Sequence, residues 1–570
     1  MLVVDKAIAG IIEKTIATLY GALPVRPAEI TLATKEEFGD FQTNFAMMNA
    51  KIIGDNPRNI AGKIRDALPE NEIIERLEVA GPGFINIFLK NSFLGSAVRQ
   101  TLTETYDFSF LDTAGDVIID YSSPNIAKRM HIGHLRSTII GDAVTRILRF
   151  LGYHVIADNH IGDWGTQFGK LIIGYRKWLN RRAYEENPIE ELERVYVRFA
   201  DEAEKDPALE EQARTELKKL QDGDPENYTL WKEFISESLK EYDKLYKRLG
   251  VVFDTYYGES FYNDLMKDVI KELVDKKLAV EDGGALVVFF DEKDKLFPCI
   301  VQKKDGAFLY STSDIATIKF RNSHYHVNKL IYLTDERQQD HFRQIFKIAD
   351  MLGWQFEKSH AWFGIMTMGD EAFSTRAGNV IRLEQLLDEG KRRAFATVDA
   401  KNPDLTREEK NRIAEVVGTG AIKYADLSQN RQSPVHFEWN KILSFEGNTA
   451  PYLQYSYARI RSILRRAEAE GKPVGDGRDI VITEPQERAI AAQILIFPMA
   501  VLKAAETYRP NIIADYLFEL GKKFNTFYNA CPILNQEDGV LYSRGQLSKA
   551  VSLTLKTGLG LLGIETLEKM

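Results

Sequence analysis

Residues 121–142, which read YSSPNIAKRMHIGHLRSTIIGD, hold the side chains of this chain that are best suited to phosphate chemistry. Lys128, His131 and His134 can donate hydrogen bonds to charge that develops on a phosphate. Gly133, between the two histidines, lets a base or a ribose approach the backbone closely. The segment therefore predicts a nucleotide site. The alternative is structural, because a histidine at such a position can simply cap a helix.

The elements around this segment place it at the start of a helix. Val117–Ile119 is an apolar run typical of a buried strand, and serine, proline and asparagine then interrupt regular structure. Apolar residues next recur at helical spacing as far as Gly152, which fits a C-terminal cap. A second apolar run, Val155–Ala157, follows. The pattern predicts a β-α-β unit, in which the N-terminus of the helix attracts phosphate through its free N–H groups and its dipole.

The same segment resembles the HIGH region of arginyl-tRNA synthetases, which are class I enzymes. The resemblance implies an enzyme that joins arginine to ATP as an adenylate, releases pyrophosphate, and transfers arginine to the terminal ribose of its tRNA. It extends over essentially the whole chain through AGPGFINI (80–87), NHIGDWGTQFG (159–169), LQDGDPE (220–226), YSTSDIA (310–316), FSTRAGN (373–379) and LLGIE near the C-terminus.

Composition indicates an ordinary soluble protein of three or four domains, with 570 residues, 44% of them hydrophobic and 28% charged. We expect no membrane span and no signal peptide. Two cysteines, Cys299 and Cys531, indicate a reducing cytoplasm, without a disulfide framework or a metal site. The net charge of −9 argues mildly against nucleic-acid binding, but an acidic protein can still present one basic face.

The chain is predicted to be a multidomain α/β protein with a Rossmann-like parallel-sheet catalytic core. Strands at Leu286–Phe290 and Lys329–Leu333 are expected to complete the sheet of that core. The all-α C-terminal domain, anticodon-binding by resemblance, shows helical segments at 451–470, 486–507, 512–530 and 544–562. The predicted domains are an α+β tRNA-contacting domain (1–112), the catalytic domain (113–370) with a helical insertion at about 176–300, a connective segment (371–440) and the helical domain (441–570).

The resemblance assigns roles in the activation step, where a carboxylate attacks the α-phosphorus in line and catalysis is mostly positioning and charge stabilisation. His131 and His134 match the two histidines of the family motif and are expected to contact ATP and the transition state, with Gly133 beside them. Lys128 is expected to join them as a catalytic cation.

The chain departs from the family pattern in the KMSKS loop, which in this class delivers a lysine to the pyrophosphate. Its counterpart at 373–379 contains no lysine. The resemblance implies that Lys128 compensates, as in many arginyl enzymes. Arg376 of the loop itself is the alternative, and Ser374 and Arg376 are expected to contact ATP.

Selection of arginine requires carboxylates or carbonyls, because a guanidinium offers five donors in a planar fork. Asp120 ends the first predicted strand, and Tyr310 and Asp314 share one face if their segment is helical. A single buried aspartate can instead pair with an arginine of the chain itself. By resemblance, the residues that hold the substrate side chain are Asp120, Tyr310, Asp314 and Gln338, and those that hold its amino and carboxylate ends are Asn125 and His131.

Contact with tRNA is expected at residues 451–466, where tyrosines alternate with arginines. Aromatic rings stack on splayed bases, while arginines meet phosphates and base edges. A solvated basic helix face with tyrosines in the core is the alternative. The candidates here are Tyr457, Arg461, Arg465 and Arg466, and those in the N-terminal domain, which resembles a module that contacts the tRNA corner, are Gln42, Phe84 and Asn86.

The expected function is that of a cytoplasmic, monomeric arginine–tRNA ligase that uses ATP with Mg²⁺ as its substrate complex and has no bound prosthetic group. One alternative is a related class I activity, of cysteinyl or glutamyl specificity, or a small-ligand adenylate ligase. Another is a non-catalytic RNA-binding paralogue. The presence of Lys128, His131 and His134 argues against the paralogue.

Overall fold

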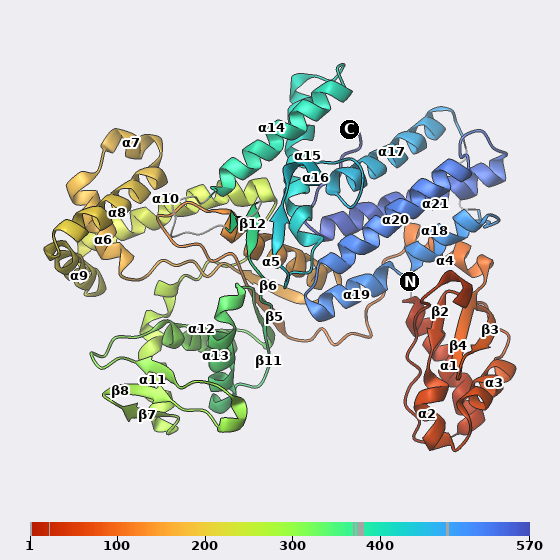
Figure 1. The fold of residues 1–570 in the computed structure, drawn as a ribbon, viewed down its shortest axis with the longest axis horizontal. Helices are drawn as coiled ribbons and strands as arrows, with labels where there is room; N and C mark the ends of the chain where they lie inside the picture. The colour runs from red at the N-terminus through yellow and green to blue at the C-terminus, as the bar shows by residue number, and fades with distance from the viewer. Residues whose placement is uncertain (1–2, 22, 369–370, 373–380, 473, 475–477) are drawn as a thin grey trace.

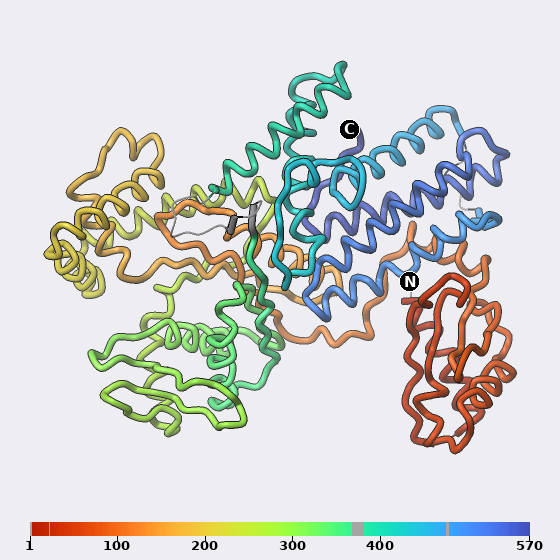
Figure 2. The backbone as a smooth tube through the Cα atoms, in the orientation of Figure 1, coloured from red at the N-terminus to blue at the C-terminus, as the bar shows by residue number. Residues whose placement is uncertain are grey.

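The computed structural model describes residues 3–21, 23–368, 371–372, 381–472, 474 and 478–570. Figure 1 shows a central sheet from which two insertions extend on one side and a helical domain on the other. The N-terminal unit lies at the far end of the helical domain. In Figure 2 the backbone runs from this unit to the central sheet through a stretch, residues 104–115, without helix or strand.

The central sheet is parallel and has the order β11-β10-β5-β6. The predicted β-α-β unit contributes the inner strand β5 and the edge strand β6, and Asp120 and Asp158 lie opposite each other at the carboxyl ends of these two strands. The strands and associated helices are β5 (Asp116–Asp120), α5 (Ile132–Phe150), β6 (His154–Asp158), α12 (Tyr310–His324), β10 (Val327–Tyr332), η4 (Glu336–Gln338), α13 (Gln339–Leu352) and β11 (Glu357–His360).

The first insertion is helical, and its last helix ends at Leu249. The predicted insertion bounds of about 176–300 stay a prediction. Gly250, in the left-handed conformation, ends its last helix. Its helices are α6 (Gln167–Trp178), α7 (Arg181–Glu186), α8 (Pro188–Lys205), α9 (Ala208–Gln221) and α10 (Pro225–Leu249).

The second insertion contains Leu286–Phe290. The prediction that these residues belong to the nucleotide-binding sheet is wrong. These residues contribute β8 to a separate antiparallel sheet of order β7-β8-β9. The reason is local, because Gly283 and Gly284 both have positive φ and close a two-residue hairpin between β7 and β8. The elements are η2 (Glu259–Tyr262), α11 (Asn263–Asp275), β7 (Ala279–Asp282), β8 (Ala285–Val288), η3 (Glu292–Asp294) and β9 (Cys299–Gln302).

The N-terminal unit is an antiparallel sheet of order β1-β2-β4-β3 with helices packed against it. An ion pair between Arg488 and Asp40 (2.7 Å) joins it to the helical domain. Its elements are α1 (Val4–Tyr20), β1 (Thr31–Leu32), η1 (Glu36–Phe38), β2 (Phe41–Thr43), α2 (Phe45–Ile53), α3 (Pro57–Ala67), β3 (Ile74–Ala80), β4 (Phe84–Leu89) and α4 (Asn91–Thr103).

A small sheet of order β13-β12-β14 and a pair of helices connect the catalytic core to the helical domain. Arg136 of α5 forms a buried ion pair with Asp426 of α15 (2.8 Å), which fixes the helix pair to the core. The elements are β12 (Met366–Met368), β13 (Glu371–Ala372), α14 (Leu383–Lys401), α15 (Arg407–Leu427), β14 (Val435–Phe437) and α16 (Trp439–Ile442).

The C-terminal domain is all-α. The predicted helical segment at 486–507 consists of two helices, because Pro498 lacks the N–H that would continue the first one. This pair, Pro485–Thr507, is long and apolar enough to cross a membrane by composition alone, but more than half of it is buried within the fold, as in a core helix. The helices are α17 (Ala450–Ala469), α18 (Pro485–Leu495), α19 (Phe497–Thr507), α20 (Asn511–Ala530) and α21 (Asp538–Leu561).

Candidate active site

The turn between β5 and α5 is held in a strained conformation. Ser122, Ser123 and Ala127 have φ angles of 75°, 49° and 60°, and non-glycine residues at positive φ are uncommon. Each such residue costs on the order of 1–3 kcal/mol, so surrounding contacts must hold it. The Ser122 hydroxyl lies 2.8 Å from that of Tyr246, and the Ala127 N–H donates to Ser238 (2.9 Å). Hydroxyl groups of α10 therefore support the turn in this conformation.

Both histidines cap α5, and they do so with the same ring atom. Nδ1 of His131 accepts from the N–H of Gly133 (3.0 Å), and Nδ1 of His134 accepts from the N–H of His131 (3.1 Å). A neutral imidazole whose Nδ1 accepts carries its proton on Nε2. The capping role and the chemical role are thus compatible, because capping orients each Nε2–H as a donor.

The two histidine rings are neutral at physiological pH. Burial, and to a lesser degree the neighbouring His131, lowers the pKa of His134 to about 3. Burial and then the charge of Lys128 lower the pKa of His131. The rings lie 4.0 Å apart between centroids. A side chain at Gly133 would approach the His131 ring to 2.8 Å, so glycine is required between them.

Lys128 lies beside the histidines at the end of the strained turn. Its Nζ is 5.4 Å from the centroid of the Tyr196 ring, a cation–π contact with the helical insertion. The next residue, Arg129, pairs with Glu190 (2.8 Å) and Glu193 (3.1 Å) of the same insertion. Lys128 is exposed, so its ammonium group is available to an incoming anion.

Asp120 is already paired with an arginine of the chain. Arg321 of α12 contacts the carboxylates of Asp120 (2.6 Å) and Asp158 (2.5 Å), and the three side chains are buried. Ser123 donates to the other Asp120 oxygen (3.2 Å). This is the alternative that the sequence left open for a buried aspartate. A contact between Asp120 and a substrate guanidinium stays a prediction, with Arg321 as its competitor.

Arg321 also opposes the binding of a metal ion at this place. Among the described residues, Asp120, Asp158 and His160 bring three possible ligand atoms together. Arg321 already neutralises both carboxylates, and a cation would have to displace it. The residues therefore do not fit a protein-bound Mg²⁺.

The other predicted arginine ligands lie at the carboxyl side of the sheet. Tyr310 begins α12 and Asp314 follows one turn later, so the two share a helix face as expected. Tyr310 is 75% exposed. The Asp314 carboxylate lies 2.6 Å from Nε2 of His341. Gln338, at the end of η4, is exposed, and so is Asn125 in the strained turn.

Glu259 is a residue that the sequence reasoning missed. It belongs to η2, which packs against α12 through Phe261 and Phe320 (ring centroids 4.9 Å apart). Burial, together with the charges of Asp163 and Asp314, raises the pKa of Glu259 to about 7, against the opposite effect of His160. The charge of Glu259 also raises the pKa of Tyr310, after burial. Because only the fold brings η2 to α12, no local motif could have identified Glu259.

Ser374 and Arg376, the predicted ATP contacts of the 373–379 loop, lie outside the described residues. The alternative between Lys128 and Arg376 therefore stays a prediction.

The basic cluster of α17, which we define as Arg461, Arg465 and Arg466, is paired with acids of the chain. Glu568 contacts Arg461 (2.8 Å) and Arg465 (3.3 Å), and Glu470 contacts Arg466 (2.9 Å). All three arginines keep part of their side chains exposed.

The burial of Tyr457 argues against the prediction that its ring stacks on a tRNA base. It is 3% exposed, and its hydroxyl donates to Glu568 (2.6 Å), so its ring faces the core. Tyr455, 40% exposed, is presented to solvent instead, with the Arg459 guanidinium 4.8 Å from its ring centroid. Both Tyr455 and Arg459 line a cavity of about 660 Å³ between α14, α17 and α20, which Tyr452, Phe445 and Phe524 also line.

The N-terminal candidates lie side by side on β2 and β4. Gln42 is directly opposite Asn86 and donates to its side chain (3.3 Å). Asn86 is 3% exposed, so Gln42 and Phe84 are the two with partly exposed side chains.

Comparison with known families gives a match for each unit. Residues 98–439 match the catalytic domain of class I (R) tRNA synthetases, and residues 453–570 match the DALR anticodon binding domain. Residues 5–89 match the arginyl tRNA synthetase N terminal domain. Together the three families account for most of the chain.

Individual relatives and solved structures belong to the same family as these matches indicate. An arginine–tRNA ligase of Fusobacterium nucleatum is 63% identical over 570 residues, with 100% of both chains covered. The arginyl-tRNA synthetase structure from Plasmodium falciparum matches with a TM-score of 0.84 and 27% identity over 100% of both chains. That from Thermus thermophilus matches with a TM-score of 0.85 and 26% identity, over 99% of this chain and 100% of the other.

Proposed function

The chain belongs to the class I arginyl-tRNA synthetases, and we propose here how its own residues carry out the reaction of that family. It activates arginine with ATP to arginyl-adenylate and transfers the arginine to the 3′-terminal ribose of tRNA, releasing pyrophosphate and AMP. The observation that carries the proposal is the capped pair His131 and His134, with Lys128 beside it.

In this proposal His131 and His134 act as neutral donors. Their Nδ1 atoms are used in capping, so each Nε2–H is directed away from the helix with a fixed orientation. A donor that is oriented before the reaction needs no reorganisation when charge develops on the phosphate. Gly133 allows the nucleotide to lie against the helix start. Lys128 adds a positive charge, which takes the place of the missing loop lysine, with Ser374 and Arg376 as further ATP contacts.

The arginine pocket in this proposal joins the second insertion to the helices of the central sheet. Asp314 and Glu259 supply carboxylates to the guanidinium, with Tyr310 and Gln338 around them, because a planar fork of donors pairs best with several acceptors. Asn125 and His131 hold the amino and carboxylate ends. Asp120 takes part if Arg321 gives up one of its contacts.

We propose that Mg²⁺ enters with ATP as part of the substrate complex. The described carboxylates nearest the turn are neutralised by Arg321, so the phosphates are the better ligands.

For tRNA, the supported contacts are the exposed faces of α17 and of the N-terminal sheet. The cavity lined by Tyr455 and Arg459 combines an aromatic surface with a cation, which suits a splayed base. Arg461, Arg465 and Arg466 would meet the phosphates next to it, and Gln42 and Phe84 would meet the tRNA from the N-terminal unit. The predicted domain bounds, a monomeric state and a cytoplasmic location remain part of the proposal.

The test is ATP–pyrophosphate exchange over a panel of amino acids, with and without tRNA. We expect exchange with arginine alone, and a requirement for tRNA. Exchange with cysteine or glutamate would favour another class I specificity, and binding of tRNA without exchange would favour an RNA-binding paralogue.

A further inference from the structure

Helix α10 of the first insertion carries a polar stripe on an otherwise buried face. Ser238, Tyr242 and Tyr246 recur every four residues, which places them on one side of the helix. Their exposures are 0%, 0% and 2%. Buried hydroxyl groups need partners, and this stripe finds its partners in the strained turn that precedes the HIGH histidines.

Tyr242 makes two of these contacts with a single oxygen. Its hydroxyl lies 2.6 Å from the carbonyl of Asn125 and 2.9 Å from that of Lys128. The two carbonyls belong to the residues assigned to the amino acid and to the phosphates, on opposite sides of Ala127. One phenol oxygen thus fixes the spacing between the two halves of the predicted site.

We propose that Tyr242 is a positioning residue of the activation step, which holds Asn125 and Lys128 at the separation that the reaction needs. Ser238, which accepts from the Ala127 N–H, and Tyr246, which bonds the Ser122 hydroxyl, support it on the same stripe. The proposal rests on the activation chemistry proposed above. It gives the helical insertion a part in catalysis that its own composition does not indicate.

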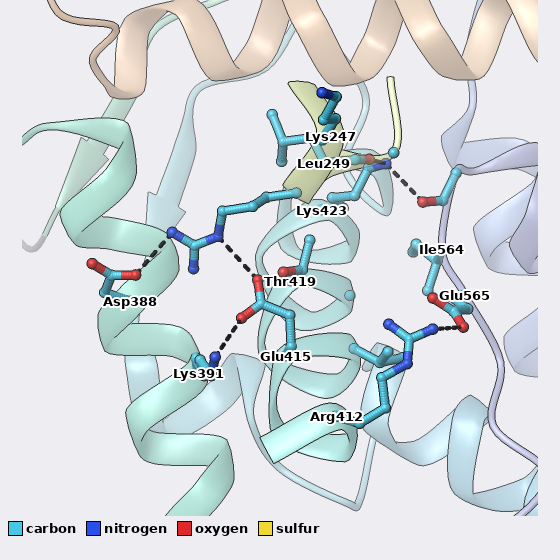
Figure 3. Close-up of a pocket in the computed structure, with 15 residues that line it drawn as sticks. Lys247, Leu249, Asp388, Lys391, Arg412, Glu415, Thr419, Lys423, Ile564 and Glu565 are labelled. Atoms are coloured by element: carbon cyan, nitrogen blue, oxygen red, sulfur yellow. Dashed lines mark hydrogen bonds and ion pairs between the residues drawn. The ribbon is translucent and has the colours of Figure 1, made fainter. Parts of the chain in front are cut away.

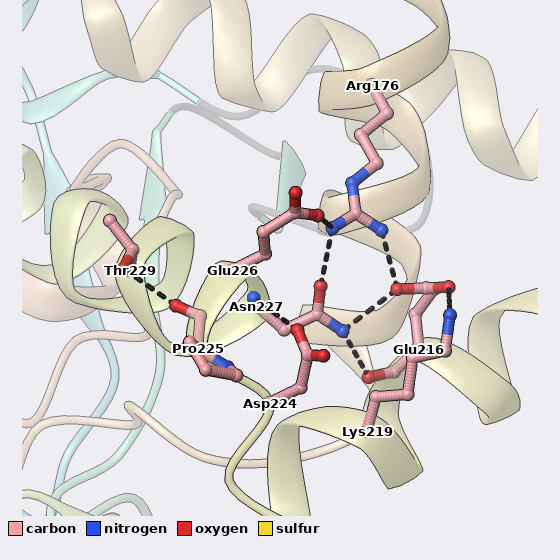
Figure 4. A network of polar contacts seen from close by, with 8 residues as sticks. All are labelled: Arg176, Glu216, Lys219, Asp224, Pro225, Glu226, Asn227 and Thr229. Carbon is pink, nitrogen blue, oxygen red and sulfur yellow. Dashed lines mark hydrogen bonds and ion pairs between the residues drawn. The ribbon is translucent and has the colours of Figure 1, made fainter.

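The N-terminal end of α10 is fixed independently of the turn. Figure 4 shows Arg176 of α6 directed at the start of α10, where it contacts Asn227 (2.8 Å) and Glu226 (3.0 Å), and at Glu216 of α9 (2.7 Å). The Asp224 side chain caps the helix by accepting from the N–H of Asn227 (3.0 Å). Two other helices of the insertion, α6 and α9, therefore hold this end of α10.

The C-terminal end of α10 is fixed to the catalytic core and its connective helices. Arg248 contacts Asp388 of α14 (2.8 Å) and Glu415 of α15 (3.0 Å). Both acids are labelled in Figure 3. The buried Lys423 donates to the carbonyl of Leu249 (2.7 Å), and Arg146 of α5 donates to that of Gly250 (2.5 Å). Because both ends are held, the stripe in the middle presents its hydroxyls from a fixed support.

Strained backbone needs such a support. Ser122, Ser123 and Ala127 adopt φ values that an isolated chain seldom adopts, and the turn would relax without outside contacts. A relaxed turn moves Asn125 and Lys128 relative to each other, and catalysis by positioning is sensitive to such displacements. The stripe is placed to prevent this relaxation.

The experiment compares Tyr242→Phe with Tyr184→Phe in ATP–pyrophosphate exchange at saturating tRNA. Tyr242→Phe removes one hydroxyl and keeps the ring, and we expect kcat to fall by about ten-fold, the effect of one buried hydrogen bond. Tyr184 is the matched control, because its hydroxyl donates to Glu233 (2.9 Å) within the same insertion but does not contact the turn. We expect Tyr184→Phe to keep the wild-type kcat.

Thermal midpoints and the KM for tRNA separate positioning from folding. The proposal expects similar small decreases of the midpoint in both variants, an unchanged KM for tRNA, and a loss of kcat in Tyr242→Phe alone. Ser238→Ala, which leaves the Ala127 N–H without its partner, should repeat the loss if Tyr242→Phe does not fold. Equal kcat in wild type, Tyr242→Phe and Ser238→Ala, or equal losses in Tyr184→Phe, would overturn it. Wild-type exchange with arginine tests the proposed function separately.

Discussion

The start of α5 and the middle of α17 are both rich in cationic or donor side chains, and both are predicted to meet phosphate. They differ in what the chain itself does with those side chains. At α5 the internal hydrogen bonds use Nδ1 of each histidine, and no described residue accepts from the Nε2 atoms. At α17 the charges themselves are paired, two arginines with Glu568 and one with Glu470.

Hydrogen bonds and ion pairs within the chain can thus either orient a donor for its ligand or compete with that ligand for the donor. Contacts that fix a donor without using it add to catalysis, because orientation is achieved before the substrate arrives. Ion pairs that use the charge must open when the ligand binds, and exposed ones contribute little by themselves. Changes at α5 should therefore have large effects that salt does not screen, and changes at α17 small effects that depend on salt.

The largest effect is expected for His134→Ala. Loss of one preorganised donor costs on the order of 10²- to 10³-fold in kcat, here measured by ATP–pyrophosphate exchange. The KM for arginine should stay the same. His134→Asn, whose side-chain oxygen can still cap the helix, is the control for stability, and its thermal midpoint should exceed that of His134→Ala. Turnover near the wild-type value in His134→Ala would remove His134 from the catalytic group.

A smaller effect is expected at the arginine pocket. Asp314→Asn keeps the shape and removes the charge, and removal of a charged partner from a desolvated site costs about 2 kcal/mol at the lower end of the usual range, or about 30-fold. We take the lower end because Asp314 is partly exposed and shared with His341. The KM for arginine should rise by that factor while that for ATP stays constant. Use of citrulline by the wild type would contradict the assignment.

The sequence was sufficient for the site at α5 because its information is local. A strand, a break and a helix of the right period are all encoded within about forty residues, and the structure has them where they were predicted. The capping histidines were left with two interpretations, and the hydrogen-bond geometry is compatible with both.

The features of the site that the sequence did not predict depend on contacts between distant parts of the chain. The pairing of Arg321 with Asp120 joins α12 to β5, and the contact of η2 with α12 brings Glu259 near Asp314. Neither leaves a periodic or motif signal. The hairpin at Gly283 and Gly284 did leave one, since two adjacent glycines between apolar runs favour a tight turn, and the prediction for these residues did not use it.

Glu259 is expected to make the affinity for arginine depend on pH. Its pKa is raised to about 7 in the free protein, mainly by burial, so its carboxyl group is partly protonated at neutral pH. A bound guanidinium favours the charged form, so arginine binding releases a proton below about pH 7. Affinity for arginine should fall as pH falls, by about five-fold between pH 7 and pH 6, and level off above neutrality.

The control is Glu259→Gln, in which this dependence should disappear while binding at pH 6 is retained. Titration calorimetry in two buffers of different ionisation enthalpy measures the released proton directly. His160 and His341 also lie nearby, so a pH dependence that persists in Glu259→Gln would assign it to a group other than Glu259.

The smallest effects are expected at α17, and two opposite changes test them together. Changing Arg461, Arg465 and Arg466 to alanine removes phosphate contacts, so tRNA affinity should fall by a few-fold and its salt dependence should weaken, by about 0.9 in slope per phosphate. Glu568→Gln removes the acid that competes for Arg461 and Arg465 and keeps an acceptor for Tyr457. Affinity for tRNA should then rise by about two-fold, within the small range of an exposed ion pair, and the salt slope should steepen.

The measurement is the tRNA dissociation constant over a series of salt concentrations, with thermal midpoints to control for folding. If Glu568→Gln and the triple alanine variant both leave the slope unchanged, the arginines serve the fold alone, and the tRNA lies on another face of the helical domain.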